Sequence, residues 1–359
     1  MKKFLRFKAG PGILRIIREE GLKPERVRVF VGPAGGPKWF VSVGFDKAII
    51  KSKFLEKSSF QRVLLAGASA GAWRCLAMAC KDPLSAYEKL RVAYSRNIFT
   101  SRDNPETVSD KIRENVRAFI NEKDIAHILN HLKFDLAIHV VRSKHLAASE
   151  NQKVEGLALM MSAGLNVIQS GLMSVFYDRV LFHTPKIKPG FVSKGYKGIL
   201  ARINEKNIEQ VALATGSLPY LIKGVAGIVG APEGVYRDGG LVNYQLNEDY
   251  SPEDGLTLFF HYQERIIPGW FDKRLPWRKP STKILDRVLQ IYPDESFKEI
   301  LPGRKIPDRN DFMTFVDNPS ERIRRWDEVC KTSEILAEDF METVESGQIC
   351  NRVEPLIPE

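Results

Sequence analysis

The feature that most constrains the fold is a strand–turn–helix junction at residues 61–74, QRVLLAGASAGAWR. The apolar run 63–66 predicts a buried strand, and the residues after Gly71 have the composition of a helix. Ser69 stands between Gly67 and Gly71, where the chain must turn sharply. This serine is either a nucleophile held on a strained turn or one small residue of a tight strand-to-helix junction.

Strand-like and helix-like segments alternate around this junction. The patterns predict helices at 11–20, 38–50 and 70–80, with strands at 26–32 and 62–67. Short apolar strands that alternate with helices form βα units, which build a mainly parallel sheet. We therefore expect an α/β fold.

The rest of the chain extends this pattern without a break. Residues 84–131 and 318–345 have helical periodicity, while 134–143 and 255–263 read as strands. No Ser/Gly-rich linker divides the chain, so we expect a single domain over 1–359. Within it, the motifs lie in a core of about 26–245, followed by a C-terminal strand and helical part at 246–359.

The most apolar long stretch is 157–177, LALMMSAGLNVIQSGLMSVFY. Asn166, Gln169 and three serines interrupt it, and it lacks the flanking cations of a membrane span. We interpret it as a largely buried helix, with a mobile lid or a lipid-contacting helix as the alternative.

Charge and cysteine usage indicate the surroundings of the protein. The net charge of +10 favours anionic partners. Four scattered cysteines form no disulfide framework and no CxxC pair, which is typical of reduced, cytoplasmic proteins. The first 22 residues lack the apolar stretch of a Sec signal, and we expect neither a signal peptide nor a transmembrane helix.

A second glycine-bearing loop follows the strand at 26–32. Its sequence, GPAGGPK from Gly32 to Lys38, lacks the spacing of GxGxxG and of GxxxxGK followed by Ser or Thr. Gly35 and Gly36 would let backbone N–H groups approach an oxyanion, which serine hydrolases require. Lys38 would steady the loop or meet an anionic headgroup. A phosphate-binding loop or a plain turn remains the alternative.

A third stretch, GVYRDGGLVNYQL at 234–246, places Asp238 before two glycines. Asp-Gly alone commonly marks a turn. Together, however, the order GGxK, GxSxG and DGG resembles the patatin-like phospholipase family, over about three-fifths of the chain. That family's signature is a DGGGxRG loop, a GxSxG serine and an aspartate in DGG or DGA. The segment 213–225, LATGSLPYLIKGV, resembles the small-residue and proline segment before the family's DGG strand.

The resemblance implies a three-layer α/β/α fold and a Ser–Asp dyad that works without histidine. It matches Ser69 to the nucleophile and Asp238 to the base. It also implies an oxyanion hole made by Gly35, Gly36 and the N–H of Ala70. The residues that support these motifs are Gly67, Gly71, Lys38, Gly239 and Gly240.

The glycine loop departs from the family pattern. Ala34 replaces its first glycine, Lys38 its arginine and Trp39 the glycine that follows, and no aspartate opens the motif. These departures concern the oxyanion loop and not the nucleophile. The implied activity is that of a phospholipase A-type enzyme or lysophospholipase, which cleaves carboxylic esters through an acyl-enzyme without a cofactor.

Histidines distinguish the dyad from a Ser–Asp–His triad, in which the histidine follows the acid in the chain. Only His261 follows Asp238, so a soluble α/β-hydrolase-type esterase or thioesterase would use it. His127, His131 and His139 would form a metal cluster only if the fold joined them, and no HExxH motif surrounds them. We expect no metal site.

Two basic segments that carry aromatic residues, 182–203 and 264–279, suit contact with an anionic membrane. Solvated loops are the simpler interpretation. No nucleic-acid recognition motif accompanies them, and we expect no nucleic-acid partner. A third functional class is therefore a non-catalytic peripheral membrane protein that binds lipid.

Overall fold

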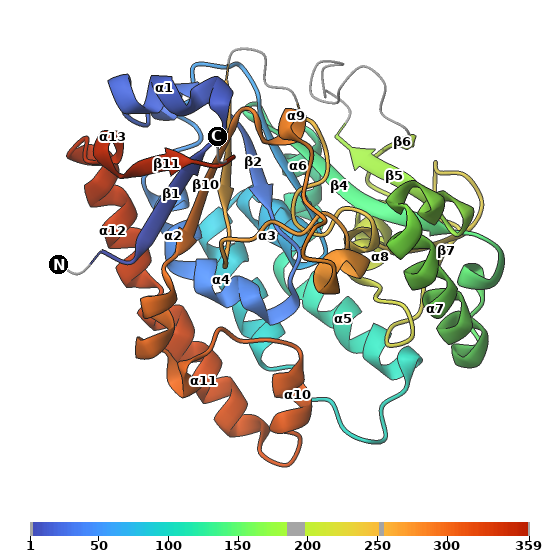
Figure 1. Cartoon of the computed structure of the whole chain (residues 1–359). Coiled ribbons are helices and arrows are strands. Elements are labelled where there is room, and N and C mark those ends of the chain that lie inside the picture. Colours follow the sequence, from blue (N-terminus) through green and yellow to red (C-terminus); the bar gives the residue numbers. More distant parts are fainter. Residues whose placement is uncertain (1–2, 185–197, 251–254, 358–359) are drawn as a thin grey trace.

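An 11-stranded sheet forms the centre of the molecule (Figure 1). The computed structural model describes residues 3–184, 198–250 and 255–357. The strand order is β11-β1-β10-β9-β2-β3-β4-β5-β6, with β8 paired to β4 and β7 to β8. The strands are β1 (Leu5–Ala9), β2 (Val27–Gly32), β3 (Val63–Ala68), β4 (Phe134–Ser143), β5 (Tyr177–His183), β6 (Ile199–Arg202), β7 (Val225–Ala226), β8 (Val235–Asp238), β9 (Leu256–Phe260), β10 (Val288–Pro293) and β11 (Val353–Pro355).

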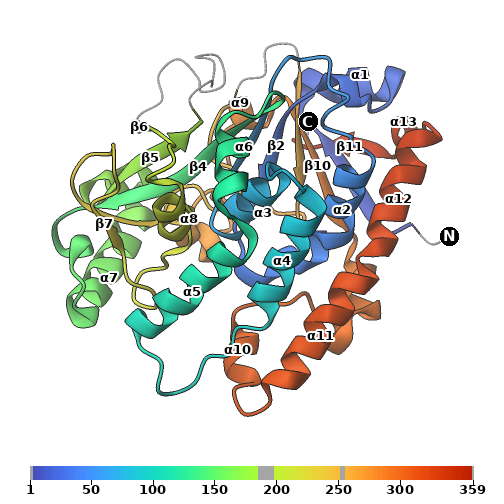
Figure 2. The same cartoon turned by 180° about the vertical axis from the view of Figure 1, so that it is seen from behind.

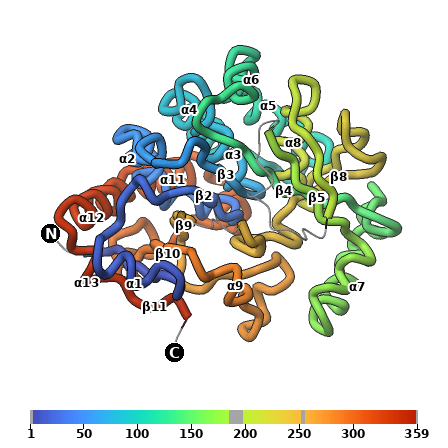
Figure 3. The backbone as a smooth tube through the Cα atoms, turned by 90° about the horizontal axis from the view of Figure 1, so that it is seen from above, coloured from blue at the N-terminus to red at the C-terminus, as the bar shows by residue number. Residues whose placement is uncertain are grey.

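Helices cover both faces of this sheet, as the views in Figures 2 and 3 show. The α-helices are α1 (Pro11–Glu20), α2 (Val43–Lys51), α3 (Ala70–Met78), α4 (Pro83–Ser95), α5 (Pro105–Phe119), α6 (Glu122–Leu129), α7 (Gln152–Ile168), α8 (Ile208–Gly216), α9 (Thr282–Leu285), α10 (Asn310–Thr314), α11 (Pro319–Thr332), α12 (Glu334–Glu345) and α13 (Ile349–Arg352). Three 3-10 helices also matter here: η2 (Gly36–Ser42), η4 (Ser170–Val175) and η7 (Trp270–Arg274).

The middle of the sheet is parallel. Strands β10, β9, β2, β3 and β4 run in one direction, whereas β1, β5 and β8 run antiparallel to their neighbours β10 and β4. In Figure 3, α2, α3 and α4 lie on one side of the row of strands and α1 and α9 on the other. The predicted mixed α/β fold with a mainly parallel central sheet in three layers is confirmed.

Two predicted helical segments differ in detail. The predicted helix at 38–50 begins as η2 and becomes α-helical only at Val43. Residues 84–131 contain three helices, because the side chains of Asn104 and Asn121 cap the starts of α5 and α6.

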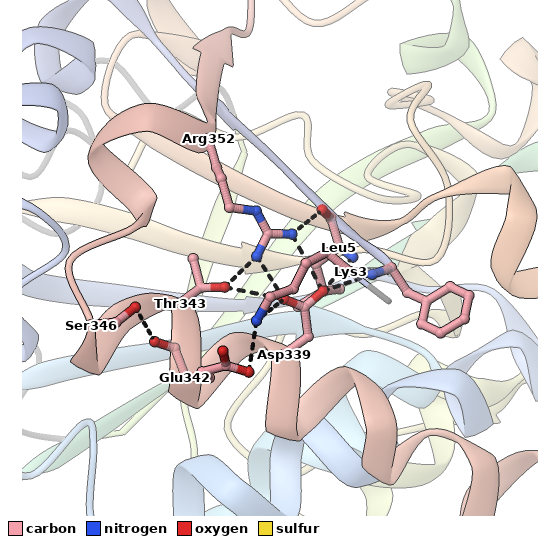
Figure 4. Close-up of polar contacts among 8 residues, drawn as sticks. Lys3, Leu5, Asp339, Glu342, Thr343, Ser346 and Arg352 are labelled. Carbon is pink, nitrogen blue, oxygen red and sulfur yellow. Dashed lines mark hydrogen bonds and ion pairs between the residues drawn. The ribbon is translucent and has the colours of Figure 1, made fainter. Parts of the chain in front are cut away.

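The two ends of the described chain lie side by side (Figure 4). The carboxylate of Asp339 on α12 accepts hydrogen bonds of 2.8 Å from the N–H groups of Phe4 and Leu5. Arg352 pairs with the same carboxylate and donates to the carbonyl oxygen of Leu5. Since β1, β10 and β11 also share the sheet, this arrangement favours one domain over 1–359, which stays a prediction.

The expectation of a largely buried helix at 157–177 is wrong. Helix α7 buries only Glu155, Ala158, Ser162 and Asn166, and 3-10 helix η4 follows it. Several of its large apolar side chains face solvent, with Met160 69% and Ile168 75% exposed. The expectation rested on the apolar composition of the stretch. Burial depends instead on the polar residues, which recur at helical spacing on the side of α7 that faces the protein.

The two basic segments are described unequally. Lys186, Lys188, Lys194, Lys197, Phe191 and Tyr196 of the segment 182–203 lie outside the described residues. The segment 264–279 contains η7, with Ile266 and Leu275 buried and Trp277 exposed. No helix in the described ranges is long and apolar enough to cross a membrane.

Candidate active site

Ser69 sits on a sharply bent backbone between β3 and α3. Its φ of 53° and ψ of −134° lie in a region that non-glycine residues rarely occupy. The flanking glycines are needed because a Cβ on Gly71 would overlap the carbonyl oxygen of Gly32, and a Cβ on Gly67 would lie 2.8 Å from it. The predicted strand–turn–helix is therefore present, with small residues where the glycine loop crosses the helix start.

Strand β4 explains how Ser69 and Asp238 meet although they are far apart in the sequence. Strand β3 runs parallel to β4 and ends with Ala68 opposite His139. Strand β8 runs antiparallel to β4 and ends with Asp238 opposite Val140. Since β5 occupies the other edge of β4 over this stretch, β3 and β8 share one edge and their carboxyl ends point at each other.

The resulting contact is a direct hydrogen bond. The Ser69 hydroxyl donates to Oδ2 of Asp238 at 2.8 Å, and both side chains are buried. The other carboxylate oxygen, Oδ1, accepts the N–H of Gly240 at 2.7 Å. This second bond fixes the carboxylate. A Cβ on Gly240 would lie 2.9 Å from the same oxygen, which explains the second of the predicted motif glycines after Asp238. The first, Gly239, has no room for a Cβ, which would overlap the carbonyl oxygen of His139.

Burial raises the pKa of Asp238 above its ordinary value. The positive charge of Arg309 is the largest influence in the opposite direction, followed by the hydrogen bonds from Gly240 and Ser69. A carboxylate made more basic in this way is better suited to take a proton from a hydroxyl.

Thr215, at the end of α8, holds the bent backbone in place. Its Oγ1 accepts the N–H of Ser69 at 2.9 Å and its hydroxyl donates to the carbonyl of His139 at 2.7 Å. The side chain is fully buried. Sequence reasoning missed this residue: it lies within the segment 213–225, but no local pattern marks a threonine that bridges two strands.

The glycine loop, residues 32–38, lies against the turn after Ser69 and the turn after Asp238. A Cβ on Gly240 would lie 3.5 Å from the Cβ of Ala34, and the N–H of Ala34 donates to the carbonyl of Tyr244 at 2.9 Å. Gly36 has a φ of 58°, which favours glycine. Within the described ranges, no hydrogen bond uses the N–H groups of Gly35, Gly36 or Ala70.

Three cationic side chains surround the loop and the dyad. Lys38 stands on η2, Lys273 on η7 with its Nζ 4.3 Å from the ring centre of Tyr244, and Arg309 just before α10. None of the three forms an ion pair with a carboxylate in the part of the chain that the structure describes. Loss of surrounding water, then the charges of Arg309 and Lys38, lowers the pKa of Lys273 to about 7. The sequence pointed to Lys38 in the glycine loop and to Lys273 as part of the basic segment 264–279, but not to Arg309.

A cavity of about 350 Å³ opens onto Ser69. Its walls are mostly apolar, and Arg309 is the cation among the lining residues. The principal apolar side chains are Trp73, Tyr94, Phe99, Leu218, Leu221 and Phe312. Phe312 and Arg309 lie beyond the basic segment 264–279, in a stretch for which the sequence offered no functional interpretation.

The histidines lie apart from the dyad. All six are among the described residues, and none of them hydrogen-bonds to Ser69 or Asp238. His261 is fully buried, with Nδ1 against the carbonyl of Gln263. His139 bonds to Tyr250 through Nε2, whereas His127 and His131 contact each other on α6 and just after it. The structure therefore does not join His261 to a Ser–Asp–His triad.

Comparison with known proteins finds structural similarity but no sequence match. No protein-family model matches the chain, and no curated protein matches its sequence. Among solved structures, it is similar to human GIVD cytosolic phospholipase A2, with a TM-score of 0.39 and 11% sequence identity. The alignment covers 94% of this chain and 62% of that one, so the chain spans less than two thirds of the phospholipase's length.

Proposed function

We propose that this protein is a lipid acyl hydrolase that cleaves carboxylic esters with Ser69 as nucleophile and Asp238 as base. The observation that carries the proposal is the 2.8 Å hydrogen bond from the Ser69 hydroxyl to Asp238. A buried serine held at φ 53° against a buried carboxylate is the arrangement that nucleophilic catalysis requires.

The proposed reaction begins with proton transfer. Asp238 takes the hydroxyl proton as Ser69 Oγ attacks the ester carbonyl, and a tetrahedral oxyanion forms. The N–H groups of Gly35, Gly36 and Ala70, which have no partner in the described part of the chain, are the candidate donors to this oxyanion. Collapse of the intermediate releases the alcohol, which receives the proton from Asp238, and leaves an acyl ester on Ser69.

Hydrolysis of this ester repeats the steps with water. Asp238 removes a proton from the water molecule, which attacks the acyl carbonyl. The second intermediate then collapses, Asp238 returns the proton to the departing Ser69 Oγ, and the carboxylic acid is released. The apolar walls of the cavity above Ser69 favour an acyl chain, and the three nearby cations favour an acidic lipid. A phospholipid or lysophospholipid ester is therefore the substrate class that we propose.

The experiment compares variants on a short soluble acyl ester and on a panel of lipids, with products identified by mass spectrometry. We expect Ser69→Ala to lower kcat/KM by about a thousandfold or more. Asp238→Asn, which keeps the shape of the side chain, should lower it by about a hundredfold or more. Ser95→Ala removes a buried serine hydroxyl in α4 that bonds only to a backbone carbonyl in the described structure, and it serves as the matched control.

A fluorophosphonate probe adds an independent readout. It should label wild type and Ser95→Ala but not Ser69→Ala. Folded wild-type protein that takes no label and hydrolyses no ester would favour the non-catalytic lipid-binding alternative. Hydrolysis that survives Ser69→Ala would contradict the proposal outright.

A further inference from the structure

Helix α7 buries a polar stripe and exposes an apolar side, which is the reverse of an ordinary surface helix. Its buried stripe consists of Glu155, Ala158, Ser162 and Asn166. The opposite side exposes Leu157, Met160, Met161, Val167 and Ile168. Surface helices normally bury the apolar stripe and expose the polar one. No charged residue occurs between Glu155 and Asp178, so the exposed apolar surface of α7 after Glu155 and of η4 carries no charge.

Polar contacts hold the helix in this orientation. Glu155 accepts the N–H of Tyr220 at 2.8 Å and pairs with Arg237 at 2.8 Å. At the other end, the Asn166 amide donates to the carboxylate of Asp272 at 2.7 Å. Burying these groups without partners would be costly, so the contacts specify which side of α7 faces outward.

The exposed apolar surface continues beyond the helix. Arg278 donates to the carbonyl oxygen of Asn166 at 2.7 Å, which docks the segment 264–279 on the end of α7. Its neighbour Trp277 is 64% exposed. We call the exposed side chains of Leu157, Met160, Met161, Val167, Ile168 and Trp277 the α7 face.

Helix α7 is also connected to the candidate active site by apolar side chains. Leu159 lines a small apolar cavity together with Leu218, Leu221 and Trp270. Leu218 and Leu221 line the cavity over Ser69 as well. Apolar side chains therefore extend from α7 to the reacting hydroxyl, which is the path that an acyl chain leaving a lipid layer would follow.

Cations frame this surface. Lys153 at the start of α7, and Arg274 and Lys279 on either side of Trp277, are exposed. None of them forms an ion pair with a carboxylate within the described ranges. Exposed tryptophan and apolar side chains bordered by lysine and arginine match the layers of an anionic bilayer, with its hydrocarbon interior and negative headgroups.

We infer that the α7 face is the surface through which this protein binds an anionic lipid bilayer. The apolar side chains insert among the acyl chains, and the bordering cations contact the headgroups. Binding of this kind requires no catalysis, so it is independent of the proposed hydrolysis and is retained when Ser69 is replaced.

The test measures sedimentation of the protein with vesicles made of equal parts phosphatidylcholine and phosphatidylglycerol. All proteins carry Ser69→Ala, so that the vesicles stay intact. We expect Met160→Glu with Ile168→Glu to weaken vesicle binding by about tenfold or more. The control is Leu132→Glu, which alters an 84% exposed leucine just after α6, and it should bind as the parent does. Helix α6 lies away from α7 in Figure 3.

Two further measurements distinguish the outcomes. In the active protein, the α7 double variant should hydrolyse a soluble short-chain ester as wild type does and melt at the same temperature. Unchanged vesicle binding in the double variant would overturn the inference. So would a concentration-dependent dimer that the double variant abolishes, since the α7 face would then bind a second copy. Vesicle binding that depends on the α7 face in a protein with no esterase activity would support the inference and remove only the proposed function.

Discussion

Helices α3 and α7 are both rich in apolar residues, yet the fold treats them in opposite ways. Every residue of α3 is buried, between the sheet and α4. Its single charge, Arg74, is fully buried and donates two hydrogen bonds to the carboxylate of Asp46. Helix α7 instead buries its polar stripe and exposes its apolar side. Apolar content alone therefore does not determine burial. The side of a helix that faces inward depends on where its polar residues lie and whether they form hydrogen bonds or ion pairs there.

Replacing one glycine in each helix by alanine tests this contrast with the largest expected effect. Gly71→Ala in α3 should destabilise the protein by roughly 3 kcal/mol or more, because its Cβ has no space beside Gly32. Gly164→Ala in α7 should stabilise it by roughly 0.5–1 kcal/mol, since no atom lies within 4 Å of the added Cβ. Urea unfolding measures both. Equal shifts of the two midpoints would show that α3 and α7 are packed alike.

Truncation of large side chains tests the same contrast without altering the backbone. Leu76→Ala in α3 removes a fully buried side chain and should cost about 2–5 kcal/mol. Met160→Ala in α7 removes a side chain that is 69% exposed, and it should change the free energy of unfolding by about 0.5 kcal/mol or less. A large loss from Met160→Ala would mean that α7 is covered by protein in solution.

The same contrast explains how much of the molecule the sequence could predict. The βα alternation predicted the sheet, and glycines marked Ser69 and Asp238 because close backbone approaches tolerate no side chain. Thr215 and Arg309 could not be found in this way. Each acts through a partner distant in the chain, namely the N–H of Ser69 and the carboxylate of Asp238, and neither belongs to a local pattern. The burial of α7 was misjudged for the same reason, since Asp272 and Arg237 are the distant partners of its polar stripe.

Replacing buried hydroxyls compares α7 with Thr215 of α8, which holds the turn at the start of α3. Thr215→Val removes the acceptor for the Ser69 N–H, which should lower kcat by roughly 10–100-fold, because an unpaired buried N–H costs about 1–3 kcal/mol and the strained turn relaxes. Thr215→Ser should restore most of the activity. Ser162→Ala, which removes a buried hydroxyl in α7 bonded to the carbonyl of Ala158, should leave kcat unchanged. Equal losses from both positions would indicate a general packing effect rather than positioning of Ser69.

The smallest expected effect comes from neutralising one arginine near α3 and one near α7 and measuring the pH dependence of kcat/KM. Asp238 acts as a base only when it is ionised, so kcat/KM on a soluble neutral ester should rise with pH through the pKa of this carboxyl, which burial holds above its ordinary value. Arg309, beside the start of α3, lowers that pKa. Arg309→Gln should therefore raise the pKa of Asp238 and move the acidic limb of the pH profile to higher pH. Arg278→Gln, at the end of α7, removes a cation that contacts Asn166 instead, and it should leave the limb in place. A limb that stays at the same pH in Arg309→Gln would mean that Asp238 is not the group whose ionisation controls the reaction, whereas a shift in both variants would assign the effect to the overall charge of the protein.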